Sequence, residues 1–296
     1  MAEIVENIAW ESEKCGYNPE KHANWDILPM EMRAECIKRM DFKTRIQLGR
    51  TSELEQSLVA TRKSYFNKFL IETKGYYDRY DQCLETAISL ELVKPDPLSP
   101  GGMERSELNG ENLSIHEMKS LKNCEFGEIQ CFGFGTHPSS THDLRRCAPF
   151  RFKSLKSKGG NLHMAKFLLL YSAAGVENIE LNIKFEKDFS VEQIFGLQSF
   201  IKAKRVVIEY MSFEDLLEEA KKLAEKWSEH DVEIGTKCHF NTGSTKELVT
   251  GGSRDKMTIS MKNESKIVSI IVNTNLQLRQ GDVEAYVVQK PKELEK

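Results

Sequence analysis

A nearly constant interval between predicted strands constrains the fold of this chain more than any other feature. Ile179, Leu181 and Ile183 alternate with polar residues, and similar alternation begins again at Val206 and at Val232. Such alternation is typical of a strand that is buried on one face. The steps from 179 to 206 and from 206 to 232 are therefore almost equal in length. This regular interval predicts an α/β arrangement in which strands alternate with helices.

Helical patterns and a strand-rich end complete this region. Apolar residues recur at helical spacing over about 162–173, 191–202 and 213–227. The interval lies in the range of leucine-rich repeats, although their consensus is absent. An ordinary α/β domain is the alternative, because any β–α–β unit has a similar length. After Thr236 the patterns at 258–261, 267–272 and 285–288 predict an antiparallel cap that covers the open end of the repeats.

Prolines and glycines interrupt the chain between Lys94 and Asn112. Three of the eight prolines, Pro95, Pro97 and Pro100, lie close together here, and Gly101 follows directly. Such a stretch is typical of a semi-rigid linker or a long loop. We therefore predict a domain boundary inside it.

The residues before this break carry helix start signals. Pro29 suits the first position of a helix, and Ser52 with Glu55 matches a capping box. We predict helices over about 29–40 and 44–50, and a third from Ser52 that continues to Leu70, followed by another over about 77–92. Three short helices bury little apolar surface, so the rest of the chain or a partner is expected to cover them.

The order of residues in these helices resembles an F-box, and most closely the nematode type. The resemblance covers about residues 24–63 and rests on Trp25, Leu28, Pro29, Glu31, Met32, Glu35, Cys36, Ile37, Met40, Arg45, Leu48, Arg50, Thr51, Ser52, Glu55, Leu58 and Val59. Gly49 departs from the pattern, which usually has arginine there. A glycine within the helix would loosen it by up to about 1 kcal/mol.

The resemblance implies a three-helix domain that docks onto a Skp1-like adaptor and, through it, a cullin. On this basis the contact residues are expected to be Leu28, Pro29, Met32, Ile37, Met40 and Leu58. Contacts of this kind place apolar anchors of helices into a groove of the partner. Exposed apolar surface on the isolated chain is then expected.

A second resemblance lies in the remainder of the chain. Residues 197–208, and the helix start at 213–216, resemble the FTH domain that commonly follows a nematode F-box. This similarity covers about residues 120–240. FTH domains are thought to make protein–protein contacts, so the resemblance implies a surface that recruits a target.

Together these patterns predict an α+β protein in which an α/β leucine-rich-repeat-like, FTH-like domain with a β-rich cap follows an F-box. The expected parts are an N-terminal extension (1–23), the F-box (24–63), a helical connector with the Pro/Gly linker (64–112) and the substrate-binding domain (113–296). The implied function is that of a substrate adaptor of an SCF-type (Skp1–cullin–F-box) E3 ubiquitin ligase, acting in protein degradation and the ubiquitin-like conjugation pathway. A ligase-independent interaction scaffold is the alternative.

Charge and composition limit the partners and the compartment. The 296 residues contain 42 Lys and Arg against 45 Asp and Glu, a balance that argues against a generic polyanion binder. No apolar run is long enough to cross a bilayer, so no membrane span is predicted. The first residues lack a basic region and predict no secretory signal. The seven cysteines are then expected to be reduced, in the cytoplasm, the nucleus or both.

One stretch departs from the balanced charge. Residues 144–176 contain seven positive charges and no acid. Because arginine suits carboxylate and phosphate, we interpret part of this stretch as a docking site for an acidic target, with RNA less favoured. The residues concerned are Arg145, Arg146, Arg151 and Lys153. The alternative is a solvated face balanced by the acidic helix at 214–229.

The residues that usually carry chemistry do not form a known motif. The spacing of Cys124, Cys131, His137, His142 and Cys147 contains no Cys-x-x-Cys knuckle, so no metal is expected there. Cys238 and His239 are neighbours, and neighbours in a strand point to opposite faces. Nucleophile-elbow, zincin and Walker motifs are absent. Gly133 and Gly135 are interpreted as a turn or bulge. We therefore predict a non-catalytic protein without a cofactor.

Overall fold

The computed structural model divides the chain into two compact units, Met1–Arg62 and Lys63–Lys296. It describes residues 25–77, 83–95, 102–109, 113–133, 142–158, 162–173, 175–183, 192–209, 214–241, 253–275 and 280–291. Within these residues, no helix is long and apolar enough to cross a membrane.

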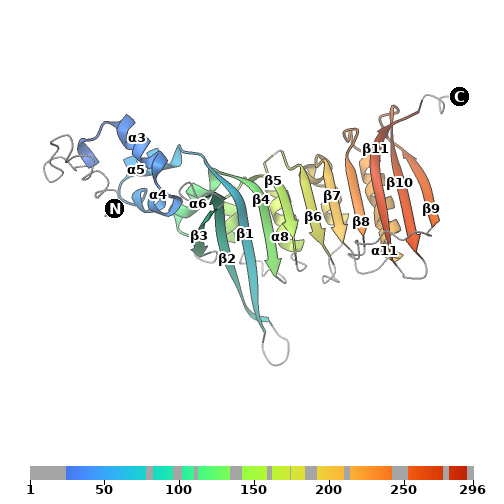
Figure 1. Ribbon diagram of the computed structural model, residues 1–296, viewed down its shortest axis with the longest axis horizontal. Coiled ribbons are helices and arrows are strands. Elements are labelled where there is room, and N and C mark those ends of the chain that lie inside the picture. The colour runs from blue at the N-terminus through green and yellow to red at the C-terminus, as the bar shows by residue number, and fades with distance from the viewer. Residues whose placement is uncertain are drawn as a thin grey trace. The chain divides into compact units, whose positions relative to one another are not determined.

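The first unit contains the three predicted α-helices, preceded by one short 3-10 turn (Figure 1). Ser52 caps the last helix by accepting a hydrogen bond from the Glu55 N–H at 3.2 Å. Ile37, Phe42, Ile46 and Val59 form the buried core of the unit. The elements are η1 (Trp25–Ile27), α3 (Met30–Arg39), α4 (Phe42–Leu48) and α5 (Glu53–Ala60).

Gly49 occupies the position after α4 rather than its interior. Its φ of −61° and ψ of −12° are right-handed helical. A Cβ there would lie 3.5 Å from the carbonyl oxygen of Arg45, an ordinary contact. The glycine therefore ends the helix without weakening its middle, and a larger residue would fit the same backbone.

The second unit is built on one 11-stranded sheet in the order β3-β2-β1-β4-β5-β6-β7-β8-β11-β10-β9. The strands from β1 through β4 to β8 run parallel, and antiparallel strands flank them on both sides. The bounds are β1 (Ser64–Tyr77), β2 (Cys83–Pro95), β3 (Met103–Asn109), β4 (Cys124–Gly133), β5 (Arg151–Ser157), β6 (Asn178–Asn182), β7 (Arg205–Glu209), β8 (Lys237–Asn241), β9 (Ser253–Ser260), β10 (Lys266–Asn275) and β11 (Gln280–Gln289).

The helices predicted after Thr61 are wrong, because this region forms strands. β1 and β2 are an antiparallel pair in which Phe69 faces Leu92 and Ile71 faces Leu90. Phe66 and Phe69 are both buried on β1, and their i, i+3 spacing imitates a helix. The expected helical connector over 64–112 is therefore part of the sheet.

The domain boundary predicted in the Pro/Gly stretch is also wrong. β2 ends at Pro95, and β3 returns beside it with Met103 opposite Pro95. The stretch thus joins two neighbouring strands of one sheet. The chain divides instead after α5, between Arg62 and Lys63.

The parallel strands share one buried pattern. Ile129, Leu155, Ile179, Val206 and Cys238 are register partners from β4 to β8, and all are buried. Each step between these partners has about the length of one β–α unit, which is roughly 30 residues. On β4 to β7, the residue three positions before each of these partners is buried as well. These residues are Phe126 on β4, Phe152 on β5, Val176 just before β6 and Ala203 just before β7.

One interval and one strand differ from the sequence prediction. The step from β6 to β7 has the predicted length, but the next strand begins at Lys237 rather than at Val232. Val232 is buried outside the strand. The antiparallel strands predicted after Thr236 are present as β9, β10 and β11.

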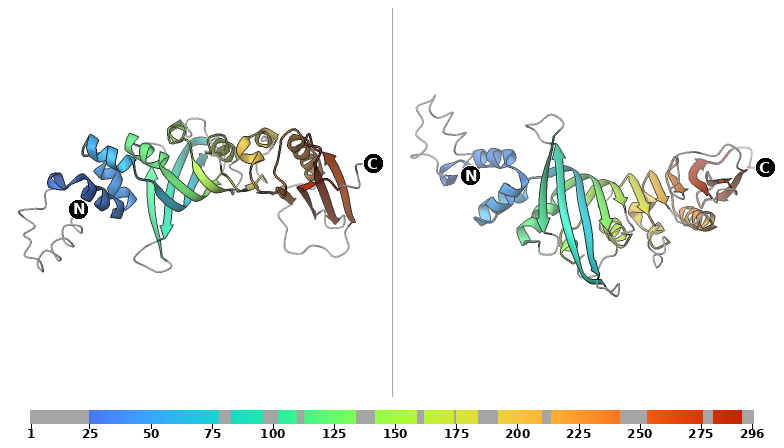
Figure 2. Two further views of the ribbon diagram at one scale, coloured as in Figure 1. Left: turned by 90° about the horizontal axis from the view of Figure 1, so that it is seen from above. Right: turned by 60° about the horizontal axis from the view of Figure 1, so that its bottom comes forward.

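Helices cover one face of the sheet (Figure 2). The largest, α11, packs against β8 to β11 and buries Leu216, Ala220, Leu223 and Trp227. The α+β class is confirmed. The helices of this layer are α6 (Ile115–Lys122), α7 (His142–Arg146), α8 (Leu162–Leu170), α9 (Glu192–Phe195), α10 (Gln198–Ile201) and α11 (Glu214–Ser228). We call the other side of the sheet the open face; Lys156, Glu180, Val207 and His239 lie on it.

Candidate functional site

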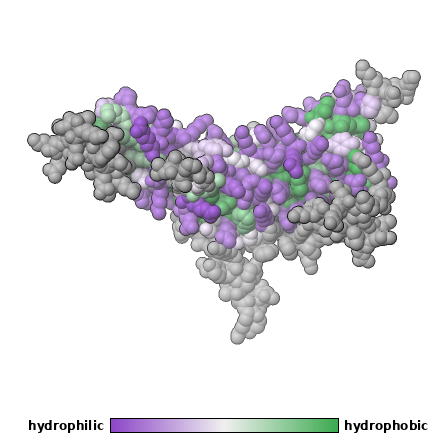
Figure 3. Space-filling model, in the orientation of Figure 1, coloured by the Kyte–Doolittle hydropathy of each residue, from purple (hydrophilic) through white to green (hydrophobic). Residues whose placement is uncertain are grey.

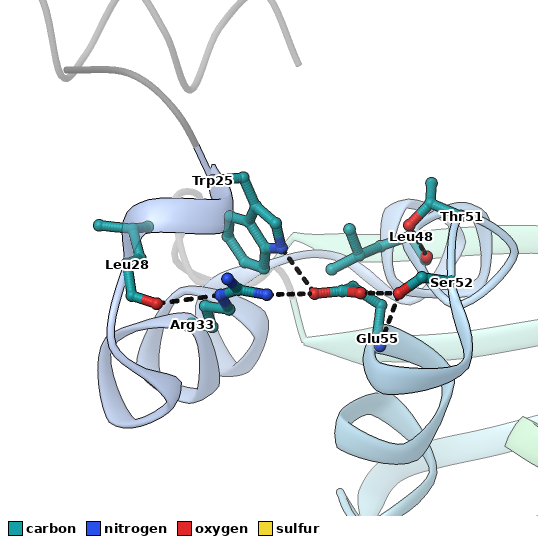
Figure 4. A network of polar contacts seen from close by, with 7 residues as sticks. All are labelled: Trp25, Leu28, Arg33, Leu48, Thr51, Ser52 and Glu55. Atoms are coloured by element: carbon teal, nitrogen blue, oxygen red, sulfur yellow. Dashed lines mark hydrogen bonds and ion pairs between the residues drawn. The ribbon is translucent and has the colours of Figure 1, made fainter.

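A buried ion pair joins the first turns of α3 and α5 (Figure 4). Arg33 Nη1 lies 3.0 Å from Glu55 Oε1, and the two side chains are only 10% and 5% exposed. The Trp25 indole N–H donates a second hydrogen bond to Oε1 at 2.8 Å. Because a buried charge without partners is strongly destabilising, this pair requires both residues.

The remaining polar atoms of the pair also have partners. Arg33 Nε donates to the Leu28 carbonyl oxygen at 3.0 Å. The Ser52 hydroxyl bonds Oε2 of Glu55 and accepts from the Glu55 N–H. Only one half of the predicted capping box is present, because the Glu55 carboxylate reaches Arg33 and Trp25 instead of the Ser52 backbone. The network therefore fixes η1, α3 and α5 against one another.

Hydrogen bonding also sets the charge state of Glu55. The Ser52 hydroxyl and the Trp25 indole are the largest causes that hold the pKa of Glu55 at about 2, against an ordinary 4.5, while burial opposes them. Glu55 is therefore a carboxylate at neutral pH, as the Arg33 pair requires. The sequence analysis missed Arg33, since no motif marks a residue whose partner lies 22 positions away.

Apolar side chains are exposed at the same end of the unit. Ile27, Met30 and Met32 are 69%, 56% and 53% exposed, and Leu54, beside Glu55, is 44% exposed. The Arg33–Glu55 pair brings the starts of α3 and α5 together, so Leu54 belongs to this end. Figure 3 shows hydrophobic colouring over this unit within mainly hydrophilic surroundings. We call Ile27, Met30, Met32 and Leu54 the apolar end.

The predicted contact residues do not all lie on the surface. Pro29 and Met32 are exposed, and Leu28 is half-buried beside them. Met40 and Leu58 are also half-buried, at the end of α3 and within α5. Ile37 is fully buried in the core. It therefore holds the helices together and offers no surface to a partner. Ile27, Met30 and Leu54 are exposed residues that the sequence analysis did not select.

The second unit presents charges on the open face of its sheet. Lys156 Nζ lies 3.4 Å from Glu128 and 3.3 Å from Glu180, and Lys68 Nζ lies 3.9 Å from Glu128. Desolvation alone would lower the pKa of Lys156, but the charges of Glu128 and Glu180 outweigh it and raise that pKa. Charges of opposite sign thus alternate across β1, β4, β5 and β6.

The same pairing continues toward the C-terminal strands. His239 Nε2 lies 3.5 Å from Asp282 Oδ2, and the Asn273 amide donates to that oxygen at 3.0 Å. The hydrogen bond from His239 is the main reason why the pKa of Asp282 is lowered. Asn182 donates to Glu209 at 2.7 Å on the same face.

The basic stretch 144–176 is divided between two layers. Arg145 and Arg146 are exposed on α7, and the Arg145 guanidinium lies 5.4 Å from the centre of the Tyr171 ring. Lys166 on α8 contacts Gln193 at 2.6 Å. Arg151, Lys153 and Lys156 lie in the sheet instead, so the stretch does not form one surface.

The residues of β5 differ in what they contact. Arg151 Nη1 donates to the Lys122 carbonyl oxygen at 2.9 Å, whereas Lys153 is exposed. The acidic helix α11 pairs its carboxylates with its own lysines, as in Lys222–Glu219 at 3.1 Å. The described ion pairs therefore do not show α11 neutralising the positive charges of β5.

The cysteine and histidine candidates are dispersed. Cys124 and Cys131 are buried on β4, and Cys147 is buried after α7. His137 lies outside the described residues. Among the described residues, no group of three or more metal-binding side chains is assembled. Cys238 and His239 point to opposite sides of β8, with Cys238 buried and His239 half-exposed. Burial raises the pKa of the Cys238 thiol.

The first unit is similar to an F-box domain. The family model of that description matches residues 25–67, which span η1 to α5 and the first residues of β1. No curated protein and no solved structure matches the chain. F-box domains generally bind a Skp1-like protein and thereby a cullin. In general they indicate substrate adaptors of SCF-type ubiquitin ligases, which are typically not catalytic.

Proposed function

We propose that this chain is the substrate-recognition adaptor of an SCF-type E3 ubiquitin ligase and that its first unit docks a Skp1-like protein. The observation that carries the proposal is the apolar end, four exposed apolar residues held beside a buried ion pair within a matched F-box domain. Exposed apolar residues on a small domain are typical of a protein-docking surface. The starts of α3 and α5 are then the parts that enter the partner.

The proposed contact residues combine the apolar end with its neighbours. Leu28, Pro29 and Met32 come from the F-box resemblance, and Met30 and Leu54 come from their exposure. Ile37 is left out because its side chain is buried. Removing exposed methionine and leucine side chains from water would supply about 25 cal/mol for each Å² that the partner covers.

The second unit is proposed to recruit the target. Residues 197–208 form α10 and β7. Their resemblance to an FTH domain supports the proposal of a nematode-type F-box protein. The shared buried pattern of β4 to β8 supports a leucine-rich-repeat-like scaffold, whose strands would leave the open face for a partner.

The proposed mechanism is proximity. An adaptor that holds a target near a ubiquitin-charged enzyme raises the effective concentration of the target lysine. The adaptor itself makes and breaks no bond in this scheme. We place this activity in the cytoplasm, the nucleus or both, where thiols such as the buried Cys124 and Cys131 stay reduced.

Co-purification with and without an intact apolar end tests the proposal. The variant carries Leu28→Ala and Pro29→Ala, and it keeps the Leu28 carbonyl that Arg33 contacts. The matched control is Met257→Ala, which truncates an apolar residue on β9 that is 38% exposed. The wild type and the control should retain a Skp1-like protein and a cullin, and the double variant should lose both.

Two outcomes bear on the alternatives. Equal retention of the Skp1-like protein by a folded double variant would contradict the proposed docking site. Failure of the wild type to retain any cullin, with other proteins bound, would favour a ligase-independent scaffold.

A further inference from the structure

The sheet of the second unit ends in two edge strands, β3 and β9 (Figure 1). β3 pairs with β2 on one side, from Met103 opposite Pro95 to Asn109 opposite Ser89. Among the described residues, no backbone hydrogen bond joins the other side of β3 to another segment. An edge strand of this kind offers a row of backbone N–H and C=O groups to a further strand.

The charges of β3 are arranged symmetrically about Ser106. Arg105 precedes this serine and Glu107 follows it, and both charged residues are exposed. Residues two positions apart in a strand point to the same face, so Arg105 and Glu107 lie on one face of the sheet. If β3 pairs antiparallel with a second copy of itself about Ser106, Arg105 of each copy therefore lies opposite Glu107 of the other.

Glu107 has a like charge as its neighbour within the chain. Its register partner on β2 is Glu91, whose carboxylate lies 3.2 Å from Arg105 Nη1. Like charges at directly opposite positions destabilise a sheet. Among the residues that the structure describes, no cation forms an ion pair with Glu107. A cation on the free side of β3 would therefore offset this repulsion.

One register of such a strand pair matches these charges. A pair centred on Arg105 would place that arginine opposite its own copy, and a pair centred on Glu107 would do the same with the glutamate. Only the pair centred on Ser106 forms two reciprocal contacts between arginine and glutamate. Because a strand register is fixed by such matches between facing side chains, the charges of β3 would make its pairing selective.

The other edge strand does not have this symmetry. In β9, Asp255 lies between Arg254 and Lys256, so the acid and the two bases point to opposite faces. No antiparallel register of β9 with itself can bring these opposite charges together. A pair centred on any of the three residues would instead bring like charges together, and such charges protect an edge from association. β3 is therefore the edge that suits a second copy of the chain.

We propose that β3 binds β3 of a second copy of this chain as an antiparallel strand, with Ser106 at the two-fold axis. The interface is isologous, because the same surface of each copy makes the contact. It joins the two sheets into one and sets two Arg105–Glu107 contacts between the copies. The inference concerns self-association and does not depend on the proposed adaptor function.

Charge reversal tests the inference on the full chain, by sedimentation equilibrium over a range of concentrations. The variants are Arg105→Glu and Glu107→Arg, measured singly, as an equal mixture and combined in one chain. The matched controls are Lys256→Glu and Asp255→Arg, which make the same charge changes at exposed residues of the other edge strand, β9.

The wild type and the two controls should form dimers with similar dissociation constants. Each single variant should dimerise at least about tenfold more weakly, because both arginine–glutamate contacts become contacts between like charges. The equal mixture of Arg105→Glu and Glu107→Arg should recover association, since every charge on one chain then faces an opposite charge on the other. The combined variant should also dimerise, because exchanging the two residues preserves both contacts.

Three results would overturn the inference. The first is a wild type that stays monomeric at every concentration. The second is a dimer that neither single variant weakens, which would place the contact elsewhere. The third is a mixture that stays monomeric although circular dichroism shows both variants folded. If a single variant fails to fold, the combined variant decides, because its new arginine at position 107 faces Glu91 on β2. A monomeric combined variant would contradict the proposed strand pair.

Discussion

Arg33 and Glu55 form an ion pair at 3.0 Å that is almost closed to solvent, and the Trp25 indole shares the same carboxylate oxygen. The residues of the apolar end lie close to this pair in sequence, with Met32 next to Arg33 and Leu54 next to Glu55. The charge pair therefore organises the surface that we propose for docking, although it takes no part in the contact itself.

Removing one member of this pair is predicted to unfold the first unit. Arg33→Ala leaves the Glu55 carboxylate buried without its counterion and should reduce stability by about 3–5 kcal/mol. Faster hydrogen exchange in peptides from α3 and α5 measures the effect. Lys38→Ala is the control, because its pair with Glu35 at 3.6 Å is exposed and should contribute less than about 1 kcal/mol. Similar exchange in the two variants would contradict the prediction.

The depressed pKa of Glu55 predicts a loss of stability in acid. The folded pKa is about 2 and the ordinary value is 4.5, so this stabilisation is complete above the ordinary pKa and is lost as the pH falls toward 2. The NMR shift of the Trp25 indole N–H reports the titration, because this group donates to Glu55. A midpoint close to the ordinary pKa of glutamate in the folded protein would contradict the structure.

Substitutions at a core residue and at a surface residue of α3 are predicted to have different effects on stability and on retention of the Skp1-like protein. Ile37→Ala removes a fully buried side chain and should lower stability by about 2–5 kcal/mol. Met32→Ala truncates a side chain that is 53% exposed, so stability should change by less than about 0.5 kcal/mol. Only Met32→Ala should weaken retention of the Skp1-like protein in a protein that stays folded. Calorimetry and co-purification of both variants check this difference.

A glycine at the end of β4 is predicted to be irreplaceable. Gly133 has φ +95°, and a Cβ there would lie 1.9 Å from the Thr73 carbonyl oxygen. Gly133→Ala should therefore cost more than the roughly 1–2 kcal/mol of left-handed strain alone. Gly175→Ala is the matched control, because it has φ +118° and open space around its Cβ position. Equal urea midpoints for the two variants would contradict the assigned contact.

The elements that the sequence predicted are those whose patterns are local. The start signals at Pro29 and Ser52 located the starts of α3 and α5, although the helix predicted from Ser52 ends at Ala60 rather than at Leu70. The alternation at Ile179 and Val206 located β6 and β7. Such signals depend on neighbouring residues, so one sequence contains them in full.

The errors arose where distant residues decide the structure. Phe66 and Phe69 fit a helix by their spacing. Phe69 instead pairs with Leu92 of β2 and Ile129 of β4, so the segment that contains both phenylalanines is a strand. The same reason explains why the Arg33–Glu55 pair was missed. Its members are 22 positions apart in the chain, and only the fold brings them together.

The repeated buried pattern of β4 to β8 has a consequence for how such a chain can change in evolution. Each parallel strand pairs only with its two neighbours, and the steps between them are of similar length. Duplication or loss of one such segment would widen or narrow the open face by about 4.8 Å without disturbing the first unit. On the function that we propose, relatives that differ in length by whole segments of this size would recruit targets of different width.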